Sequence, residues 1–123
     1  MPWQVSVHSD PAVIETRYAG AISPSELQDA VRETLELAKA HASHRFLSDC
    51  EDLIGGHSVF DLYFLADALQ QSGITRTVRE AVLLPGLPEP EANVRFWETT
   101  ARNRGIDARL FVDRASALAW LLS

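Results

Sequence analysis

The stretch EAVLL (residues 80–84) is followed directly by PGLPEP (residues 85–90). The first segment is a nearly continuous apolar run, which is typical of a strand covered on both faces. The second contains three prolines, which remove backbone donors and fix their own φ angles, so we predict a connecting loop there. A strand that is buried on both faces needs helices above and below it. The sequence on either side predicts such helices.

Three amphipathic segments surround this strand. The clearest begins at Ser23, with Pro24 at the first helical position and Glu26 placed to complete a capping box. Apolar residues then recur at three- and four-residue steps, the period of a helix with one buried face. The same periodicity predicts a second helix from about Val59 to Ser72 and a third from Glu91 to Arg104.

Predicted strands separate these helices. Alternating apolar and polar residues predict an antiparallel hairpin of Trp3 to His8 with Ala12 to Tyr18. Shorter strands are predicted at Arg45 to Cys50 and Asp107 to Val112, and Asp113 then caps a last helix. The order ββαβαβαβα predicts a single α/β domain over all 123 residues, with a mixed sheet, helices on both faces and right-handed crossovers.

The composition limits the class of partner. The formal net charge is -6, which argues against a general affinity for nucleic acid, because neutralising phosphates needs a concentrated field of Lys and Arg. The lone Cys50 excludes an internal disulfide, and the first residues have neither the basic leader nor the apolar core of a secretory signal. No apolar run approaches the ~20 residues that span a bilayer. We therefore expect a cytoplasmic protein with no nucleic-acid partner and no membrane span.

The carboxyl ends of the parallel strands predict where a ligand would bind. In such sheets the binding crevice lies beyond these ends, where helix N-termini also point their free N–H groups. The candidate binding or regulatory residues at this edge come from three strand ends and the loops after them: Asp49, Leu53, Ile54, His57, Ser58, Leu87 and Asp113. The apolar members are predicted to lie in loops, where a lid, a dimer contact or an apolar ligand would use them.

Catalysis at the same edge is an alternative. A hydrolase-type enzyme would use Asp49, Ser58 and Asp113 if these side chains converged in one pocket. Ser58 and Asp113 are also explained as helix caps. Cys50 is flanked by acidic residues and so lacks the positive surroundings of a reactive thiol. No spacing of His and Cys matches a closed zinc set. We assign no catalytic residue, no metal site and no cofactor.

Six short motifs, spread over nearly the whole chain, carry a family resemblance. They are YAG (18–20), FLSD (46–49), DLY (61–63), REAV (79–82), NRG (103–105) and ALAWL (117–121). The pattern resembles the STAS superfamily, the fold of the bacterial anti-sigma factor antagonists, and within it the SpoIIAA-like bacterial proteins.

The resemblance implies a non-enzymatic regulatory or ligand-binding module, which we expect to be a homodimer. In the anti-sigma factor antagonists, a Ser at the start of the second helix is phosphorylated by a partner kinase. The stretch GGHSV (55–59) puts Ser58 at that place, without the preceding Asp and following Gly of the family motif. SpoIIAA-like proteins are also similar in fold to Sec14-type lipid carriers. The resemblance therefore implies either a regulatory protein partner or a small apolar ligand.

Overall fold

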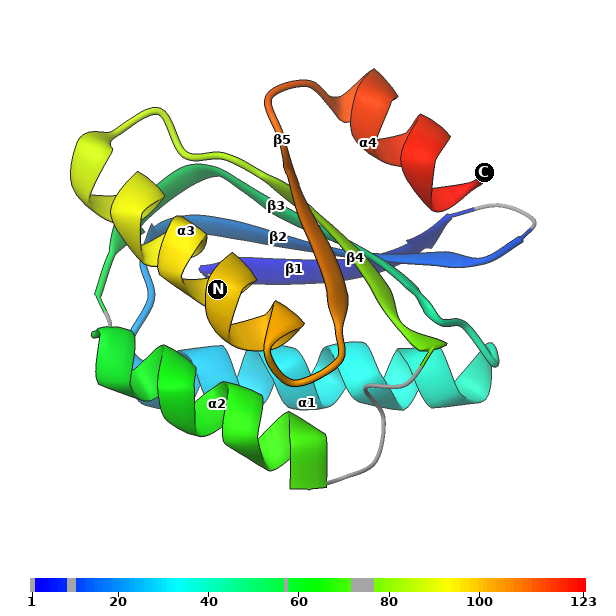
Figure 1. The fold of residues 1–123 in the computed structure, drawn as a ribbon, viewed down its shortest axis with the longest axis horizontal. Helices are drawn as coiled ribbons and strands as arrows, with labels where there is room; N and C mark the ends of the chain where they lie inside the picture. The colour runs from blue at the N-terminus through cyan, green and yellow to red at the C-terminus, as the bar shows by residue number, and fades with distance from the viewer. Residues whose placement is uncertain (1, 9–10, 57, 72–76) are drawn as a thin grey trace.

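The structure is a computed structural model and describes residues 2–8, 11–56, 58–71 and 77–123. Within these residues, five strands form one sheet in the order β1-β2-β3-β4-β5 (Figure 1). The strands are β1 (Trp3–His8), β2 (Val13–Ala21), β3 (Arg45–Gly55), β4 (Arg79–Leu83) and β5 (Asp107–Phe111). β1 runs antiparallel to β2, and the other neighbouring pairs are parallel. The predicted mixed sheet is confirmed.

Helices cover both faces of the sheet, as predicted. They are α1 (Pro24–Ala40), α2 (Val59–Gln71), α3 (Pro88–Arg102) and α4 (Arg114–Leu121). α1, α2 and α3 lie on one side of the sheet, and α4 lies on the other (Figure 1). We call these sides the three-helix face and the α4 face. No helix in the described part of the chain is both long enough and apolar enough to cross a membrane.

Each central strand serves two hydrophobic cores, because successive side chains along a strand point to opposite faces. In β3, Phe46 and Cys50 pack on the three-helix face, whereas Leu47 packs on the α4 face. In β4, Val82 packs on the three-helix face and Leu83 on the α4 face. This double burial explains why residues 80–84 are almost continuously apolar.

The predicted start of α1 is confirmed. Ser23 Oγ accepts a hydrogen bond from the backbone N–H of Glu26 at 3.2 Å, and Glu26 Oε1 accepts one from the backbone N–H of Ser23 at 3.0 Å. This reciprocal capping box satisfies two donors that would otherwise lack a partner at the first turn. α2 is described as far as Gln71, and the predicted terminal residue Ser72 lies outside the described residues.

The predicted end of β3 at Cys50 is wrong. The strand continues to Gly55, because β2 is also longer than predicted and its last residues pair with residues 52–55. Leu53 and Ile54 therefore lie in a strand, whereas the sequence analysis places them in a loop. The pairing of β2 with β3 contains register shifts near this end. The sequence of one strand alone does not reveal such shifts.

The prediction of a loop over residues 85–90 is wrong in its second half. α3 begins at Pro88, and Pro90 is also inside its first turn. The first four N–H groups of an α-helix have no acceptor within the helix, so a proline there removes no hydrogen bond. The two prolines therefore start the helix and do not interrupt it.

Gly56 makes the turn after β3. Its φ is +101°, and a Cβ atom at this position would lie 2.6 Å from both the N and the O of Ile22. The preceding carbonyl, of Gly55, accepts a hydrogen bond from the Ile22 N–H at 2.7 Å. A residue with a side chain does not fit this approach of two chain segments. The Gly-Gly pair thus joins the ends of β2 and β3.

Candidate functional site

A cavity of ≈ 120 Å³ lies between the sheet and the helices of the three-helix face. Its sheet wall consists of side chains from β2, β3 and β4, such as Tyr18, Cys50 and Val82. The opposite wall comes from all three helices and includes Val31 of α1 and Leu65 of α2. α2 packs alongside α3 on this face (Figure 1).

Glu80 is the central polar residue of this cavity. Its Oε1 accepts a hydrogen bond from Trp97 Nε1 at 2.7 Å, and its Oε2 accepts one from Ser48 Oγ at 2.8 Å. Among the described residues that line the cavity, Glu80 is the only carboxylic acid, and none is Lys, Arg or His. The carboxyl group therefore has two neutral donors and no cation beside it.

Burial raises the pKa of Glu80, and the hydrogen bonds from Trp97 and Ser48 lower it by less. The Glu80 side chain is half-buried and lines the cavity. Burial also raises the pKa of Cys50, and the negative charge of Glu80 raises it further. The pKa of Tyr18 is raised by burial first and then by the nearby Cys50 and Glu80. The thiol and the phenol therefore stay neutral.

Three hydroxyl groups on the wall, those of Thr16, Thr34 and Ser48, have hydrogen-bond partners. Thr34 Oγ1 donates to the carbonyl oxygen of Ala30 at 2.7 Å, and it lies 2.5 Å from Thr16 Oγ1, which is then the donor of that pair. A carboxylate, by contrast, has about four acceptor sites, and Glu80 uses one on each oxygen. Within the described lining, Glu80 therefore has acceptor sites that a ligand can use, as does the side-chain amide of Asn93.

On the α4 face, by contrast, a carboxyl group is paired with cationic side chains. Glu15 accepts hydrogen bonds from both terminal nitrogens of Arg114, and His8 Nε2 lies 2.5 Å from Glu15 Oε1. The hydrogen bond and charge of Arg114, with a smaller contribution from His8, hold the pKa of Glu15 below its usual value against the effect of burial. Arg17 Nε lies 3.4 Å from Asp49 Oδ2 on the same face. Glu15, Arg114, His8 and Arg17 line a polar depression over β1 and β2.

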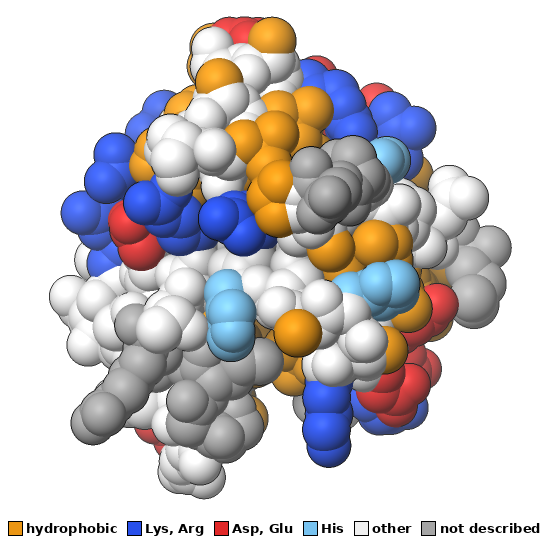
Figure 2. Space-filling view, turned by 90° about the vertical axis from the view of Figure 1, so that its right-hand side faces the viewer, with side chains coloured by type: hydrophobic (Ala, Val, Ile, Leu, Met, Phe, Trp, Pro, Cys, Tyr) orange, Lys and Arg blue, Asp and Glu red, His pale blue; other side chains and the backbone are white. Residues whose placement is uncertain are grey.

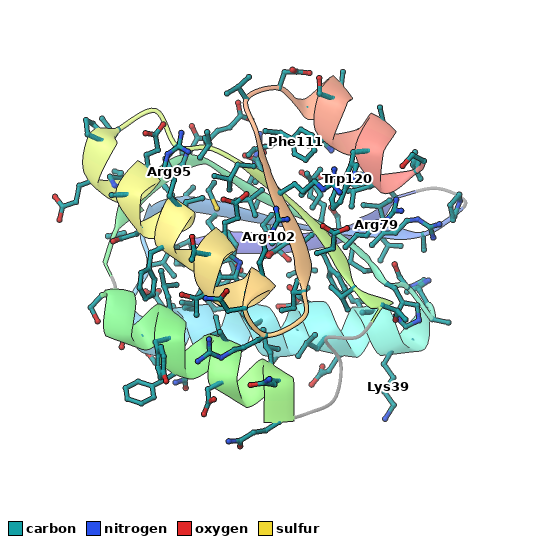
Figure 3. All side chains as sticks on the ribbon, in the orientation of Figure 1. Lys39, Arg79, Arg95, Arg102, Phe111 and Trp120 are labelled. Carbon is teal, nitrogen blue, oxygen red and sulfur yellow. The ribbon has the colours of Figure 1, made fainter. Side chains whose placement is uncertain are left out.

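Basic side chains near α4 have structural roles. Basic and hydrophobic side chains lie next to each other on the end of the molecule where α4 finishes (Figure 2). Trp120 packs against Phe111 with ring centroids 5.7 Å apart, and Arg79 reaches the same place (Figure 3). The Arg79 guanidinium lies 5.4 Å from the Trp120 ring and donates to the Trp120 carbonyl oxygen at 3.1 Å. Arg45 likewise donates to the Leu121 carbonyl oxygen at 2.8 Å. These arginines cap the C-terminal end of α4.

The structure places the described residues predicted at the strand ends in different parts of the molecule. Leu53 is 5% exposed and lines the cavity. Ile54 and Leu87 are 60% and 50% exposed. Asp49 is buried and has its ion pair with Arg17 on the α4 face. His57 lies outside the described residues.

Ser58 and Asp113 act as helix caps. Ser58 Oγ accepts the backbone N–H of Asp61 at 3.3 Å, and Asp113 accepts the backbone N–H of Ser116 at 2.8 Å, which holds the pKa of Asp113 below its usual value. In the described part of the chain, no hydrogen bond or ion pair joins any two of Asp49, Ser58 and Asp113. The convergence that the hydrolase hypothesis requires is therefore not found. The described residues also contain no group of three His, Cys, Asp or Glu side chains that could hold a metal ion.

The sequence analysis missed Glu80 as a site residue, because it treated residues 80–84 as a single apolar run. The strand pattern could have identified it: Glu80 and Val82 are two positions apart in β4, so their side chains point to the same face of the sheet. Its two donors, Ser48 and Trp97, are 32 and 17 residues away in the sequence. Only the fold brings the three together.

No protein-family model and no curated protein matches this sequence. A solved structure does match: an uncharacterized protein of the DUF3478 family from Shewanella loihica PV-4, which has a SpoIIAA-like fold. The two structures superpose with a TM-score of 0.63 and 17% sequence identity, over 97% of this chain and 93% of that chain. At this identity the similarity shows the fold alone. The chain therefore has a SpoIIAA-like fold, which confirms the fold that the sequence motifs imply.

Proposed function

We propose that this protein is a STAS-like ligand-binding module whose cavity on the three-helix face holds a small, mostly apolar molecule. The cavity itself carries the proposal. Its lining is dominated by aliphatic and aromatic side chains from the sheet and three helices, with one carboxyl group at a defined position. An apolar pocket with a few well-placed polar groups is the usual form of a small-molecule site.

The volume supports a molecule of about the size of one ring or a short alkyl chain. An engineered cavity of about 150 Å³ in another protein binds benzene, and this cavity is ≈ 120 Å³. Such a volume is smaller than a whole lipid would need, so we favour a small apolar ligand over the Sec14-type lipid cargo.

A second candidate function uses the surface predicted from the sequence. Ile54 and Leu87 are exposed apolar residues at the end of β3 and the start of α3, and a regulatory protein or a second copy of the chain would bury them. Analytical ultracentrifugation tests the homodimer. A species of 13.6 kDa at the highest concentration would rule the homodimer out.

Toluene binding tests the cavity. We expect toluene added to ¹⁵N-labelled protein to shift the amide signals of the residues around the cavity, such as Cys50 and Leu65. Leu65→Trp places a large side chain in the cavity and should weaken toluene binding at least about tenfold. Leu118→Trp is the matched control, because Leu118 is also a half-buried helical leucine but packs on the α4 face.

Two results would contradict the proposed function. One is that toluene causes no shifts in the wild-type protein at its solubility limit. The other is that toluene binds Leu65→Trp as tightly as it binds the wild type and Leu118→Trp, because the binding site would then lie elsewhere.

A further inference from the structure

Glu80 places a carboxyl group at one point of an otherwise mostly apolar cavity. Its carboxyl group is held by Trp97 Nε1 at 2.7 Å and by Ser48 Oγ at 2.8 Å, one donor on each oxygen. Trp97 comes from α3 and Ser48 from the neighbouring strand β3, so the carboxyl group is fixed from two elements. Each oxygen retains a free acceptor site.

We propose that the cavity selects molecules that carry a hydrogen-bond donor, an amine or a hydroxyl group, at the end that meets Glu80, and that it rejects carboxylates and phosphates. The inference rests on the proposed function of the cavity and names the class of ligand that the cavity takes.

The first reason is the absence of a cation among the described lining residues, which include no Lys, Arg or His. An anionic ligand would be buried beside a carboxyl group with nothing to compensate its charge, which is strongly unfavourable in an apolar site. Arginines of the sheet are engaged on the α4 face: Arg17 pairs with Asp49, and Arg45 and Arg79 donate to carbonyl oxygens at the end of α4.

The second reason is that the hydroxyl groups and the Asn93 amide of the described lining are neutral, whereas Glu80 is a carboxylic acid. Thr16 and Thr34 are bonded to each other and to the backbone. Tyr18 from β2 and Cys50 from β3 are the titratable groups beside Glu80, and both remain neutral because burial raises the pKa of each. An ammonium group at Glu80 would form a charge-assisted hydrogen bond, which is about twice as strong as one between neutral groups.

Four probes of nearly equal shape test the inference: toluene, benzyl alcohol, benzylamine and benzoate. In the wild-type protein at pH 7, we expect benzyl alcohol to bind more tightly than toluene. We expect benzylamine to bind more tightly than toluene by on the order of 10- to 100-fold. Benzoate should bind most weakly of the four.

Three variants test whether Glu80 causes the preference for benzylamine over toluene. Glu80→Gln should remove the advantage of benzylamine and improve the binding of benzoate relative to toluene. Glu15→Gln is the matched control, because it neutralises a carboxyl group on the α4 face and should leave the ranking unchanged. Trp97→Phe keeps an aromatic ring but removes one donor to Glu80, which leaves the carboxylate less compensated, so the preference for benzylamine should grow. It also provides a test if Glu80→Gln does not fold.

The outcomes separate this inference from the proposed function. If toluene binds the cavity but the four probes bind equally, or if benzoate binds most tightly, the selectivity is refuted and the cavity function stands. An unchanged benzylamine preference in both Glu80→Gln and Trp97→Phe refutes it as well. If none of the four probes binds, the proposed function fails and this inference fails with it.

Discussion

The two faces of the sheet treat a carboxyl group in opposite ways. On the α4 face, Glu15 is buried and receives two hydrogen bonds from Arg114, so its charge is paired. On the three-helix face, Glu80 is held by two neutral donors, and the described residues that line the cavity include no cation. Burying a charge is costly unless it is paired, and Glu15 follows this rule. Glu80 departs from it beside a cavity, and this departure is the observation behind the binding role that we propose for Glu80.

The two pKa shifts express the same contrast. Arg114 lowers the pKa of Glu15, so the ionised form of Glu15 is the one that stabilises the fold. Burial raises the pKa of Glu80, so the fold favours the protonated form of Glu80. Stability linked to Glu15 is therefore present above the ordinary pKa of a glutamate and is lost as the pH falls through the lowered pKa. Stability linked to Glu80 is present below that ordinary pKa and is lost as the pH rises through the raised pKa.

The largest effect is expected from breaking the ion pair on the α4 face. Arg114→Met leaves the buried Glu15 without its cation, and we expect the free energy of unfolding at pH 7 to fall by about 2 kcal/mol. This figure is below the usual range for a buried pair because the Arg114 side chain is 42% exposed. The loss should shrink at acid pH, where Glu15 is protonated and needs no partner. Urea denaturation at pH 7 and at acid pH measures both values.

Arg32→Met is the control for this experiment, because Arg32 pairs with Asp29 on the exposed side of α1. It should change stability by less than about 0.5 kcal/mol at either pH. An Arg114→Met loss that is equally large at both pH values would show that the ionised form of Glu15 does not supply the stability.

A smaller effect of the opposite sign is expected on the three-helix face. Glu80→Gln keeps the shape of the side chain but removes its charge, so the variant should be as stable as the wild type at acid pH. It should then become more stable, by on the order of 1 kcal/mol, as the pH rises through the raised pKa of Glu80. Paired urea denaturation curves across this pH range give the difference. If Glu80→Gln instead becomes less stable than the wild type as the pH rises, the ionised carboxylate of Glu80 stabilises the fold and this account is contradicted.

The smallest effect is expected from removing single hydroxyl groups on the two faces. Ser48→Ala removes one donor from Glu80, so the pKa of Glu80 should rise further while stability changes by less than about 1 kcal/mol. Ser116→Ala removes the hydroxyl donor to Asp113 at the start of α4, so the pKa of Asp113 should move up towards its usual value. Titration of the side-chain carboxyl ¹³C signals measures both. An unchanged Glu80 pKa in Ser48→Ala would show that the hydroxyl does not bind the carboxylate.

Local patterns in the sequence predicted the fold well, because they report on single elements. The capping box at Ser23 and the apolar run of residues 80–84 each depend on neighbours within a few positions, and both are confirmed. The end of β3 depends on where β2 ends, because the two strands pair there. The sequence of residues 45–55 alone therefore could not reveal it.

The candidate site could not be predicted in the same way. The sequence analysis expected the carboxyl ends of the strands to gather the functional residues, but the alternation of side chains separates them between the faces. Asp49 points to the α4 face, while Leu53, beyond a register shift, lines the cavity. The hydrogen bonds that define Glu80 reach across three elements, and no local pattern reports them.

The most direct test of the central claim is a crystal structure of the protein with benzyl alcohol. We expect the ring between the sheet and α2, beside Leu65, and the hydroxyl group within hydrogen-bond distance of a Glu80 carboxyl oxygen. Benzyl alcohol in the polar depression of the α4 face, or in the cavity with its hydroxyl group turned away from Glu80, would contradict the claim.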